Sequence, residues 1–297
     1  MREMAGLPSA LWKYTNIQLT TASGPTGRPP STATAAPGAG TRRRHPVPVL
    51  LTFALINRPD IFDLRPGNSF VEFLLDEGYD VFLVDWGYAD EEDAETGLDD
   101  FALEHIPRAV REVRRASGAE EITLIGWCIG AVLTGMYLSV TLDAPVRNWI
   151  PLTMPFDAAN TTCESLLGND EVDTDWLGQY GAFLPGSYVD TVNKLLKPAP
   201  NYVGTPLRLF RQVQDGTADR SSYQPMARWV ADTPNFPMRA FRQWVTWVYK
   251  ENRLARGRVR LRGQKVDFAA SRQSILVVTA DSAGPFGVAA PRLRTPE

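Results

Sequence analysis

The stretch that decides the fold is Glu121-Ile122-Thr123-Leu124-Ile125-Gly126-Trp127-Cys128-Ile129-Gly130-Ala131. A short β-branched apolar run leads directly into Gly-x-Cys-x-Gly, and residues 132–140 then have the composition of a helix. A strand that turns sharply into a helix holds the residue at the turn in a strained backbone conformation. A side chain at Gly126 or Gly130 would collide with the neighbouring strand or the incoming helix. The pattern therefore predicts a strand, a tight turn with Cys128 at its apex, and a helix.

This order of elements is that of the nucleophile elbow of α/β-hydrolases, with cysteine where serine usually stands. The turn would raise the sulfur above the sheet edge and point the Ile129 amide at a developing oxyanion. Two other interpretations compete with it. Residues 122–140 carry no charge and contain Gly126-x-x-x-Gly130, which also suits a membrane-spanning helix, although the β-branching of residues 122–125 favours a strand. Alternatively, Cys128 is an inert buried thiol.

Composition bounds the class of protein. The chain has 297 residues, of which 44% are hydrophobic, so it can bury one sizeable core and a cap over it. A formal net charge of −3 gives no electrostatic case for binding nucleic acid. The two cysteines, Cys128 and Cys163, do not form a disulfide framework and suit a reducing cytosol. The amino terminus lacks the pattern of a secretory signal, so a cytoplasmic protein is expected.

The chain divides into an amino-terminal segment, residues 1–45, and a core, residues 46–297. Residues 20–41 are dominated by Ala, Pro, Gly, Ser and Thr, which predicts a mobile linker, and a strand is possible at 11–19 before it. In the core, apolar strands alternate with helices, which predicts an α/β fold with a mostly parallel sheet and helices on both faces. The expected strands are 47–53, 79–84, 122–125, 148–153 and 274–279, and the expected helices are 69–77, 99–115, 132–140 and 239–254. Asp99 is expected to cap the second of these helices. A cap is expected as an insertion at about residues 157–239.

Several short motifs resemble those of the polyhydroxyalkanoate synthases, the polyester polymerases of bacterial storage granules, and most nearly the class III type. They are Ala54-Leu55-Ile56-Asn57-Arg58-Pro59, Asp63-Leu64-x-Pro66-Gly67, Asp85-Trp86-Gly87, Gly126-Trp127-Cys128-Ile129-Gly130, Trp229-x-x-Asp232-x-Pro234-x-Phe236-Pro237 and Tyr249-x-x-Asn252-x-Leu254. The resemblance covers about residues 47–279 and implies an α/β-hydrolase core with a cap.

The reaction that the resemblance implies is acyl transfer from a 3-hydroxyacyl coenzyme A thioester. Cys128 would attack the carbonyl as thiolate and hold the acyl group as a thioester, which a hydroxyl then attacks to extend the polyester. The amide of Ile129 and one from Leu55 or Ile56 would form the oxyanion hole. Asn57-Arg58-Pro59 would be either a structural turn or a substrate contact. The resemblance implies no cofactor beyond the coenzyme A substrate. It implies the polyester chain or granule surface, and a second synthase subunit or a homodimer, as partners.

The chemistry needs a base for the thiol, and here the sequence departs from the family. The family has an aspartate in an Asp-His-x-x-Pro-like motif after the penultimate strand, and a histidine on a later loop. Here Ala280-Asp281-Ser282-Ala283-Gly284-Pro285 follows the last strand, so Asp281 is a displaced candidate for the aspartate. No later histidine precedes Glu297, and we expect that the carboxyl-terminal catalytic part is truncated or altered by a change of frame.

The two histidines of the sequence are expected to lie far from Cys128. His45 precedes a strand, at the sheet edge opposite the active site, and His105 lies in a helix outside the sheet. With two distant histidines and no cluster of ligand spacing, we predict no metal site. Little or no polymerase activity is therefore expected, and two alternatives stay open: a thioesterase or polyester depolymerase, and a non-catalytic granule-associated remnant.

Two further groups invite a functional and a structural interpretation. Arg258, Arg260 and Arg262 alternate with Val259 and Leu261, so a strand there would have a basic face, which either meets coenzyme A phosphates or faces solvent. Cys163, in the cap, is expected to pack rather than react. Three aromatic residues are expected to form one helix face against the core or cap: Trp244, Trp247 and Tyr249.

Overall fold

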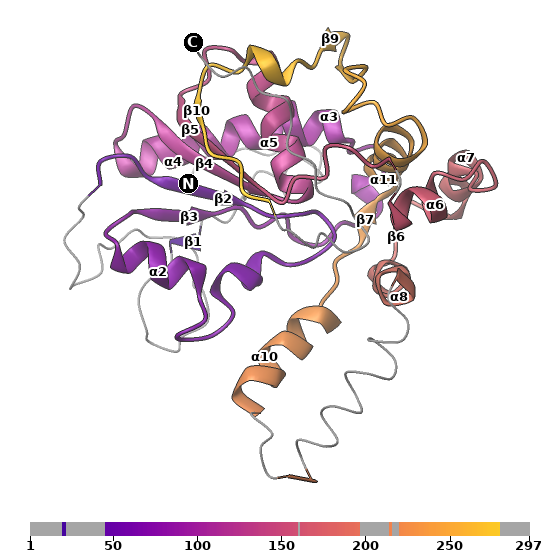
Figure 1. The fold of residues 1–297 in the computed structure, drawn as a ribbon, viewed down its shortest axis with the longest axis horizontal. Coiled ribbons are helices and arrows are strands. Elements are labelled where there is room, and N and C mark those ends of the chain that lie inside the picture. Colours follow the sequence, from indigo (N-terminus) through magenta and orange to yellow (C-terminus); the bar gives the residue numbers. More distant parts are fainter. Residues whose placement is uncertain (1–19, 22–44, 160, 197–213, 216–219, 280–297) are drawn as a thin grey trace, which may run out of the picture.

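The computed structural model describes residues 20–21, 45–159, 161–196, 214–215 and 220–279 (Figure 1). Its central sheet has the strand order β1-β3-β2-β4-β5-β10. The strands are β1 Thr20–Thr21, β2 Val49–Thr52, β3 Val81–Leu83, β4 Ile122–Trp127, β5 Val146–Leu152 and β10 Ser274–Ile275. Strand β1 is antiparallel to β3 and the other pairings are parallel. The predicted mostly parallel sheet is confirmed. The predicted linker lies almost wholly, and the strand at 11–19 entirely, outside the described residues.

Strands β2 and β4 form the middle of the sheet because their side chains are apolar on both faces. All four residues of β2 are buried, as are the first five of β4. Their parallel register pairs Leu50 with Leu124 and Thr52 with Gly126. The carboxyl ends of the two strands therefore meet at one edge, and Cys128 lies there, directly after β4.

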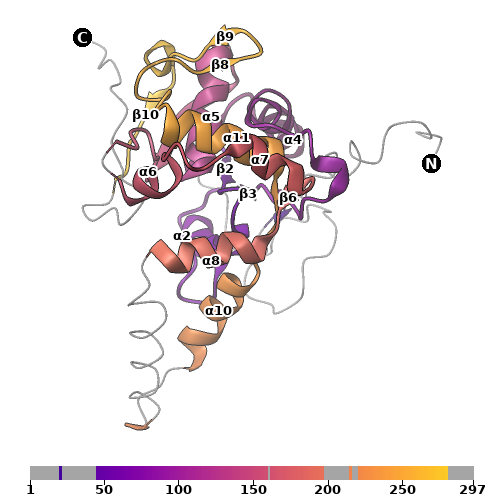
Figure 2. The ribbon, with the colours of Figure 1, turned by 90° about the vertical axis from the view of Figure 1, so that its right-hand side faces the viewer.

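Helices cover both faces of the sheet, with α2 on one side and α4 on the other (Figure 2). The helices before the cap are α2 Phe70–Asp76, α3 Leu98–Asp100, the π-helix η3 Phe101–His105, α4 Ile106–Ser117 and α5 Ile129–Val140, with short 3-10 turns η1 Pro59–Asp63 and η2 Glu91–Asp93. Residues 122–140 thus form a strand and a helix rather than one membrane span. Within the described ranges, no helix combines the length and the apolar character that crossing a bilayer requires.

The helical stretch from Leu98 corrects one expectation, because Asp99 does not cap it. The N-cap is Gly97, whose N–H donates to the carboxylate of Asp100 at 2.8 Å. Asp99 is buried and accepts hydrogen bonds from Arg239 at 2.8 Å and from Gln243 at 2.9 Å. A buried carboxylate needs such partners, so tertiary pairing outweighs the local capping role.

We call residues 157–239 the cap segment, and its described residues form helices and two short strands. They are α6 Thr162–Leu167, α7 Thr174–Leu177, η4 Gly178–Tyr180, β6 Phe183–Leu184, α8 Gly186–Leu196, α10 Arg220–Ala231 and β7 Phe236–Pro237. Strands β6 and β7 pair antiparallel. In both views α10 extends away from the sheet (Figures 1 and 2).

After the cap segment, the chain returns to the core through one long helical stretch. It comprises α11 Met238–Trp244 and the π-helix η6 Val245–Lys250, and it ends before Asn252, which has φ 47°. The remaining elements are the hairpin β8 Arg260–Leu261 and β9 Gln264–Lys265, and the turn η7 Phe268–Ala270. Val259 and Leu261 are buried while Arg258, Arg260 and Arg262 are exposed, so the basic side chains lie at the surface, where Arg262 pairs with Asp100 and Glu104.

Candidate active site

Cys128 occupies the apex of the turn between β4 and α5, with φ 54° and ψ −119°. A positive φ is unfavourable for a residue with a Cβ and persists only where the surroundings impose it. Here the Cys128 N–H donates to the Leu152 carbonyl of β5 at 3.0 Å, and the Cys128 carbonyl accepts from the Ala131 N–H at 3.0 Å. The strand–cysteine–helix elbow expected from the sequence is present.

The two glycines of the elbow lie where a side chain would not fit. A Cβ on Gly126 would come within 2.6 Å of the Ala131 Cα in the incoming helix. A Cβ on Gly130 would come within 2.4 Å of the Thr52 carbonyl oxygen at the end of β2. Both approaches are far shorter than van der Waals contact, so the close packing of the helix against the strands requires glycine. The steric role predicted for both glycines is confirmed.

The thiol of Cys128 is half-buried and its pKa is raised to about 11. Burial is the main cause, a hydrogen bond from the Ile129 N–H opposes it in part, and the nearby Cys163 adds to the rise. The contact places the Ile129 amide beside the sulfur, where the predicted oxyanion donor would act. At neutral pH the thiol is protonated, so it needs a base to become a nucleophile.

The second predicted oxyanion donor belongs to the loop after β2, residues 53–58. The start of the loop lies against α5, because a Cβ on Gly130 would also lie 2.6 Å from the Phe53 carbonyl oxygen. Leu55 is buried and Ile56 is half-buried. At the end of the loop, the Arg58 guanidinium is engaged within the protein by the Asp85 carboxylate, with N–O distances of 2.6 and 2.7 Å. The pairing favours a structural turn over a substrate contact at Arg58.

The described histidines lie away from the elbow, as expected. His45 precedes β2 at the amino end of the sheet, and its ring stacks on Tyr79 with centroids 3.9 Å apart. His105 belongs to η3, where burial lowers its pKa to about 4. Neither contributes to the pKa of Cys128. Asp281 lies outside the described residues, and its role stays a prediction.

The structure brings Tyr249 and Cys163 toward Cys128, a grouping that the sequence analysis missed. Cys163 is buried in α6 and forms a hydrogen bond with the Tyr249 hydroxyl from η6. Tyr249 in turn accepts from the Trp244 indole, and its pKa is raised by burial and by both cysteines. The sequence feature that could have pointed to this grouping is the Tyr249-x-x-Asn252-x-Leu254 motif. It gave no indication of which residues contact the tyrosine.

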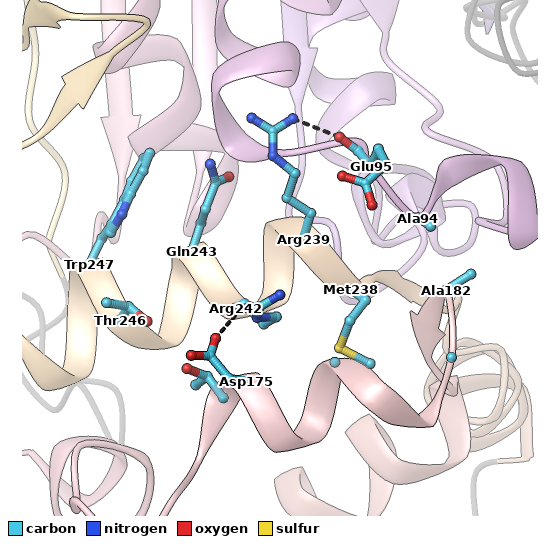
Figure 3. A pocket seen from close by; sticks show the side chains of 13 residues that line it. Ala94, Glu95, Asp175, Ala182, Met238, Arg239, Arg242, Gln243, Thr246 and Trp247 are labelled. Atoms are coloured by element: carbon cyan, nitrogen blue, oxygen red, sulfur yellow. Dashed lines mark hydrogen bonds and ion pairs between the residues drawn. The ribbon is translucent and has the colours of Figure 1, made fainter.

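A cavity of about 560 Å³ lies between residues 94–95, α7, η4 and α11 (Figure 3). Cys128 does not line it. Each of its two arginines is already paired: Arg239 with Asp99 at 2.8 Å, and Arg242 with Asp175. These pairings leave the cavity without the surplus positive charge that a phosphate group would require.

Comparisons with known proteins give three findings. A family model described as alpha/beta hydrolase fold matches residues 59–223. The chain is 31% identical over 248 residues to the poly(3-hydroxyalkanoate) polymerase subunit PhaC of Haloferax mediterranei, covering 81% of this chain and 49% of that protein. It is 32% identical over 230 residues to the subunit PhaC of Allochromatium vinosum, and this match covers 77% of this chain and 64% of that protein. A solved structure, a putative lipase from Sulfolobus solfataricus, aligns with 81% of this chain and 80% of that chain at 14% identity and a TM-score of 0.48.

The chain corresponds to only part of each of these longer relatives. The chain spans about half of the Haloferax protein and less than two thirds of the Allochromatium protein. The match to the family model, residues 59–223, includes the elbow at Cys128.

Proposed function

The chain belongs to the α/β-hydrolase fold family and is a sequence relative of PhaC polymerase subunits, and from this we propose that it is an acyltransferase of polyester synthesis. Its proposed substrate is a 3-hydroxyacyl coenzyme A thioester, and its proposed product is poly(3-hydroxyalkanoate). The observation that carries the proposal is the strained cysteine elbow with an amide beside the sulfur, in a chain similar to proteins named for that polymerisation.

In the proposed mechanism, the Cys128 thiolate attacks the thioester carbonyl and expels coenzyme A as thiolate. The acyl group then forms a new thioester on the enzyme, and because one thioester replaces another, the group stays activated toward a hydroxyl nucleophile. The Ile129 amide and an amide of Leu55 or Ile56 would stabilise the oxyanion in each step. The chemistry needs no cofactor beyond the coenzyme A of the substrate.

The proposed reaction needs a base that removes the proton from the Cys128 thiol. Burial holds the pKa of Cys128 near 11, and neither His45 nor His105 acts on it. We therefore propose that the 297-residue chain turns over slowly or not at all by itself. A non-catalytic, granule-associated role is the second candidate, and the same raised pKa favours it. A thioesterase or depolymerase, in which water is the acceptor, shares the first half of the mechanism.

The proposed setting follows from the substrate. A 3-hydroxyacyl coenzyme A and a growing polyester would be met in the cytoplasm at the surface of a storage granule. A second synthase subunit, or a second copy of the chain, is the proposed protein partner.

The test is to trap the acyl-enzyme. The purified chain is incubated with 3-hydroxybutyryl coenzyme A, and its intact mass and peptide map are measured. We expect one hydroxybutyryl group on Cys128, and none in a Cys128→Ala variant. Polymer, free hydroxy acid or neither product would distinguish synthase, thioesterase and remnant, and a chain whose Cys128 is never acylated would contradict the acyltransferase proposal.

A further inference from the structure

Two consecutive residues after β3 hold both ends of the loop at 53–58. The Trp86 indole N–H donates to the Phe53 carbonyl at 3.2 Å, at the start of the loop. At the end of the loop, the Asp85 carboxylate accepts hydrogen bonds from both terminal nitrogens of Arg58, at 2.6 and 2.7 Å. We call Arg58, Asp85 and Trp86 the loop clamp.

The pairing in the loop clamp is partly desolvated. The side chain of Arg58 is 14% exposed and that of Asp85 is 21% exposed. A two-point guanidinium–carboxylate contact fixes direction as well as distance, and it strengthens as water is removed. The Asp85 carboxylate is itself oriented, because it accepts the Gly87 N–H at 2.9 Å. The end of the loop is therefore fixed in orientation relative to β3.

The cap segment is attached to the same residues. The Trp229 indole of α10 donates to the Arg58 carbonyl at 2.7 Å. The Arg58 guanidinium lies over the Tyr88 ring, 4.9 Å from its centroid, and the Tyr88 hydroxyl donates to Asp232 at 2.7 Å. Any shift of α10 would therefore act on Arg58 directly and through Tyr88.

We propose that Arg58 is a positioning residue, which holds the amides of Leu55 and Ile56 at the oxyanion position and couples them to the cap segment. The inference rests on the proposed function, because it takes this loop to supply an oxyanion donor. The physical reason for the positioning role is that an oxyanion donor must be placed to within a fraction of an ångström. A loop held at one end alone does not give that precision. Nothing in this role requires Arg58 to touch the substrate.

The test compares two reactions of one sulfur, in the full chain with Cys163→Ala so that Cys128 is the only thiol. Acylation by phenyl thioacetate passes through a tetrahedral oxyanion, whereas alkylation by iodoacetamide does not. Arg58→Lys keeps the charge but loses the two-point contact. We expect acylation to fall roughly 10- to 100-fold, while alkylation changes by less than about twofold because the thiolate fraction is unaltered.

Arg253→Lys is the matched control, because Arg253 has a similar pairing elsewhere. Its guanidinium contacts Glu251 at 2.6 and 3.0 Å and lies over Trp247, 5.8 Å from the ring centroid. Both rates should stay near those of the parent chain in this control. If Arg58→Lys lowers both reactions equally, or leaves acylation unchanged, the positioning role is wrong.

The link to the cap is tested with Trp229→Phe, which removes the indole donor and keeps an aromatic ring. We expect a selective loss of acylation, smaller than that of Arg58→Lys because Asp85 still holds the guanidinium. Unchanged acylation in this variant would overturn the coupling to α10.

A second acyl donor separates the two proposals. If phenyl thioacetate acylates Cys128 but 3-hydroxybutyryl coenzyme A does not, the proposed substrate is wrong, and the ratio of the two reactions still tests the loop clamp. For each donor, the rate of acylation is divided by the rate of alkylation, in the folded chain and in the urea-unfolded chain. If this ratio is no higher in the folded chain for either donor, the loop does not stabilise an oxyanion and the positioning role fails as well.

Discussion

The reactivity of Cys128 should depend on pH in a way that an exposed cysteine does not. With a pKa of about 11, roughly one sulfur in ten thousand is ionised at pH 7. Because the thiolate is the reacting form, the rate of alkylation by iodoacetamide should rise about tenfold per pH unit and continue rising beyond pH 9.

The measurement uses Cys163→Ala, followed by mass spectrometry of the alkylated peptide. The urea-unfolded chain is the control, and its rate should level off near the pKa of an ordinary cysteine, about 8.5. A plateau at that pH in the folded chain as well would show that burial does not control this sulfur.

Gly130 should tolerate no side chain. In Gly130→Ala, the new methyl group would meet the Thr52 carbonyl oxygen at 2.4 Å, and neither the strand nor the helix can move without disturbing the other. We expect a loss of about 2–3 kcal/mol in the free energy of unfolding, measured by urea titration.

Gly257→Ala separates this steric effect from backbone strain. Gly257 has φ 61° and open space around it, so alanine there should cost only about 1 kcal/mol. Equal losses in the two variants would mean that the close approach at Gly130 does not matter.

At the level of single residues, the sequence predicted what local geometry determines. Gly-x-Cys-x-Gly between an apolar run and a helix is enough to predict Cys128 at the apex, because few other backbones accept that pattern. The partners of the sulfur are a different matter. Tyr249 and Cys163 reach it from separate elements of the fold, and a single sequence does not encode which distant side chains meet.

Among the elements, the junction of α11 with the start of the helical stretch at Leu98 depends on a buried charge. Asp99 is buried and contacts Arg239 at 2.8 Å, while Arg239 is 37% exposed and keeps Asp100 as a second partner. Asp99→Ala should lower the free energy of unfolding by about 2 kcal/mol, less than for a fully buried pair because of that exposure.

The exposed pair of α4 is the control for this prediction. Glu112 contacts Arg115 at 2.5 Å near the helix surface, where solvent screens the attraction. Glu112→Ala should change the free energy of unfolding by less than about 0.5 kcal/mol, when both variants are measured by urea titration. A loss at Asp99 no greater than at Glu112 would show that the junction is held by apolar packing alone.

The elements themselves were predictable, but their helical type was not. A helix at 239–254 was expected, and the structure has α11 followed by the π-helix η6, which ends at Lys250. The i to i+5 spacing of a π-helix brings the Tyr249 ring edge-on to the Trp244 ring, with centroids 6.1 Å apart. Since residues 244, 245, 247, 248 and 249 are all apolar or aromatic and all buried, their pattern does not distinguish the two helix types.

For the whole molecule, the outer edge of the sheet is the expected site of self-association. Strand β10 pairs with β5 and, within the described ranges, with no other strand. Leu276 and Val278 continue that pairing and are 59% and 41% exposed. Open apolar edges attract further strands, so Leu276→Lys should reduce aggregation of the purified chain, measured by light scattering against concentration.

An equally apolar position away from the edge serves as the control. Leu166 is 48% exposed on α6, where the backbone is already hydrogen-bonded within the helix. Leu166→Lys should leave aggregation nearly unchanged. If both variants reduce aggregation to the same extent, exposed apolar area and not the strand edge is responsible.

The architecture as a whole was accessible from the sequence because buried parallel strands have a distinctive composition. Runs such as residues 49–52 and 122–126 are apolar on both faces, and the alternation with helices leaves few other topologies. For the cap segment, the sequence predicted no element bounds, and its role as a cap stays a prediction. Its contacts with the loop at 53–58 depend on single indole and hydroxyl groups, which no periodic pattern records.

The loop clamp also has a consequence for how such a protein can change. Asp85 and Trp86 are adjacent, so they hold Phe53 and Arg58 at a fixed span, and an inserted or deleted residue between them would break one of the two attachments. The length of the loop at 53–58 is therefore constrained. If the proposed function holds, we expect differences in the acyl group accepted to come from changes in the cap segment rather than from changes in the length of this loop.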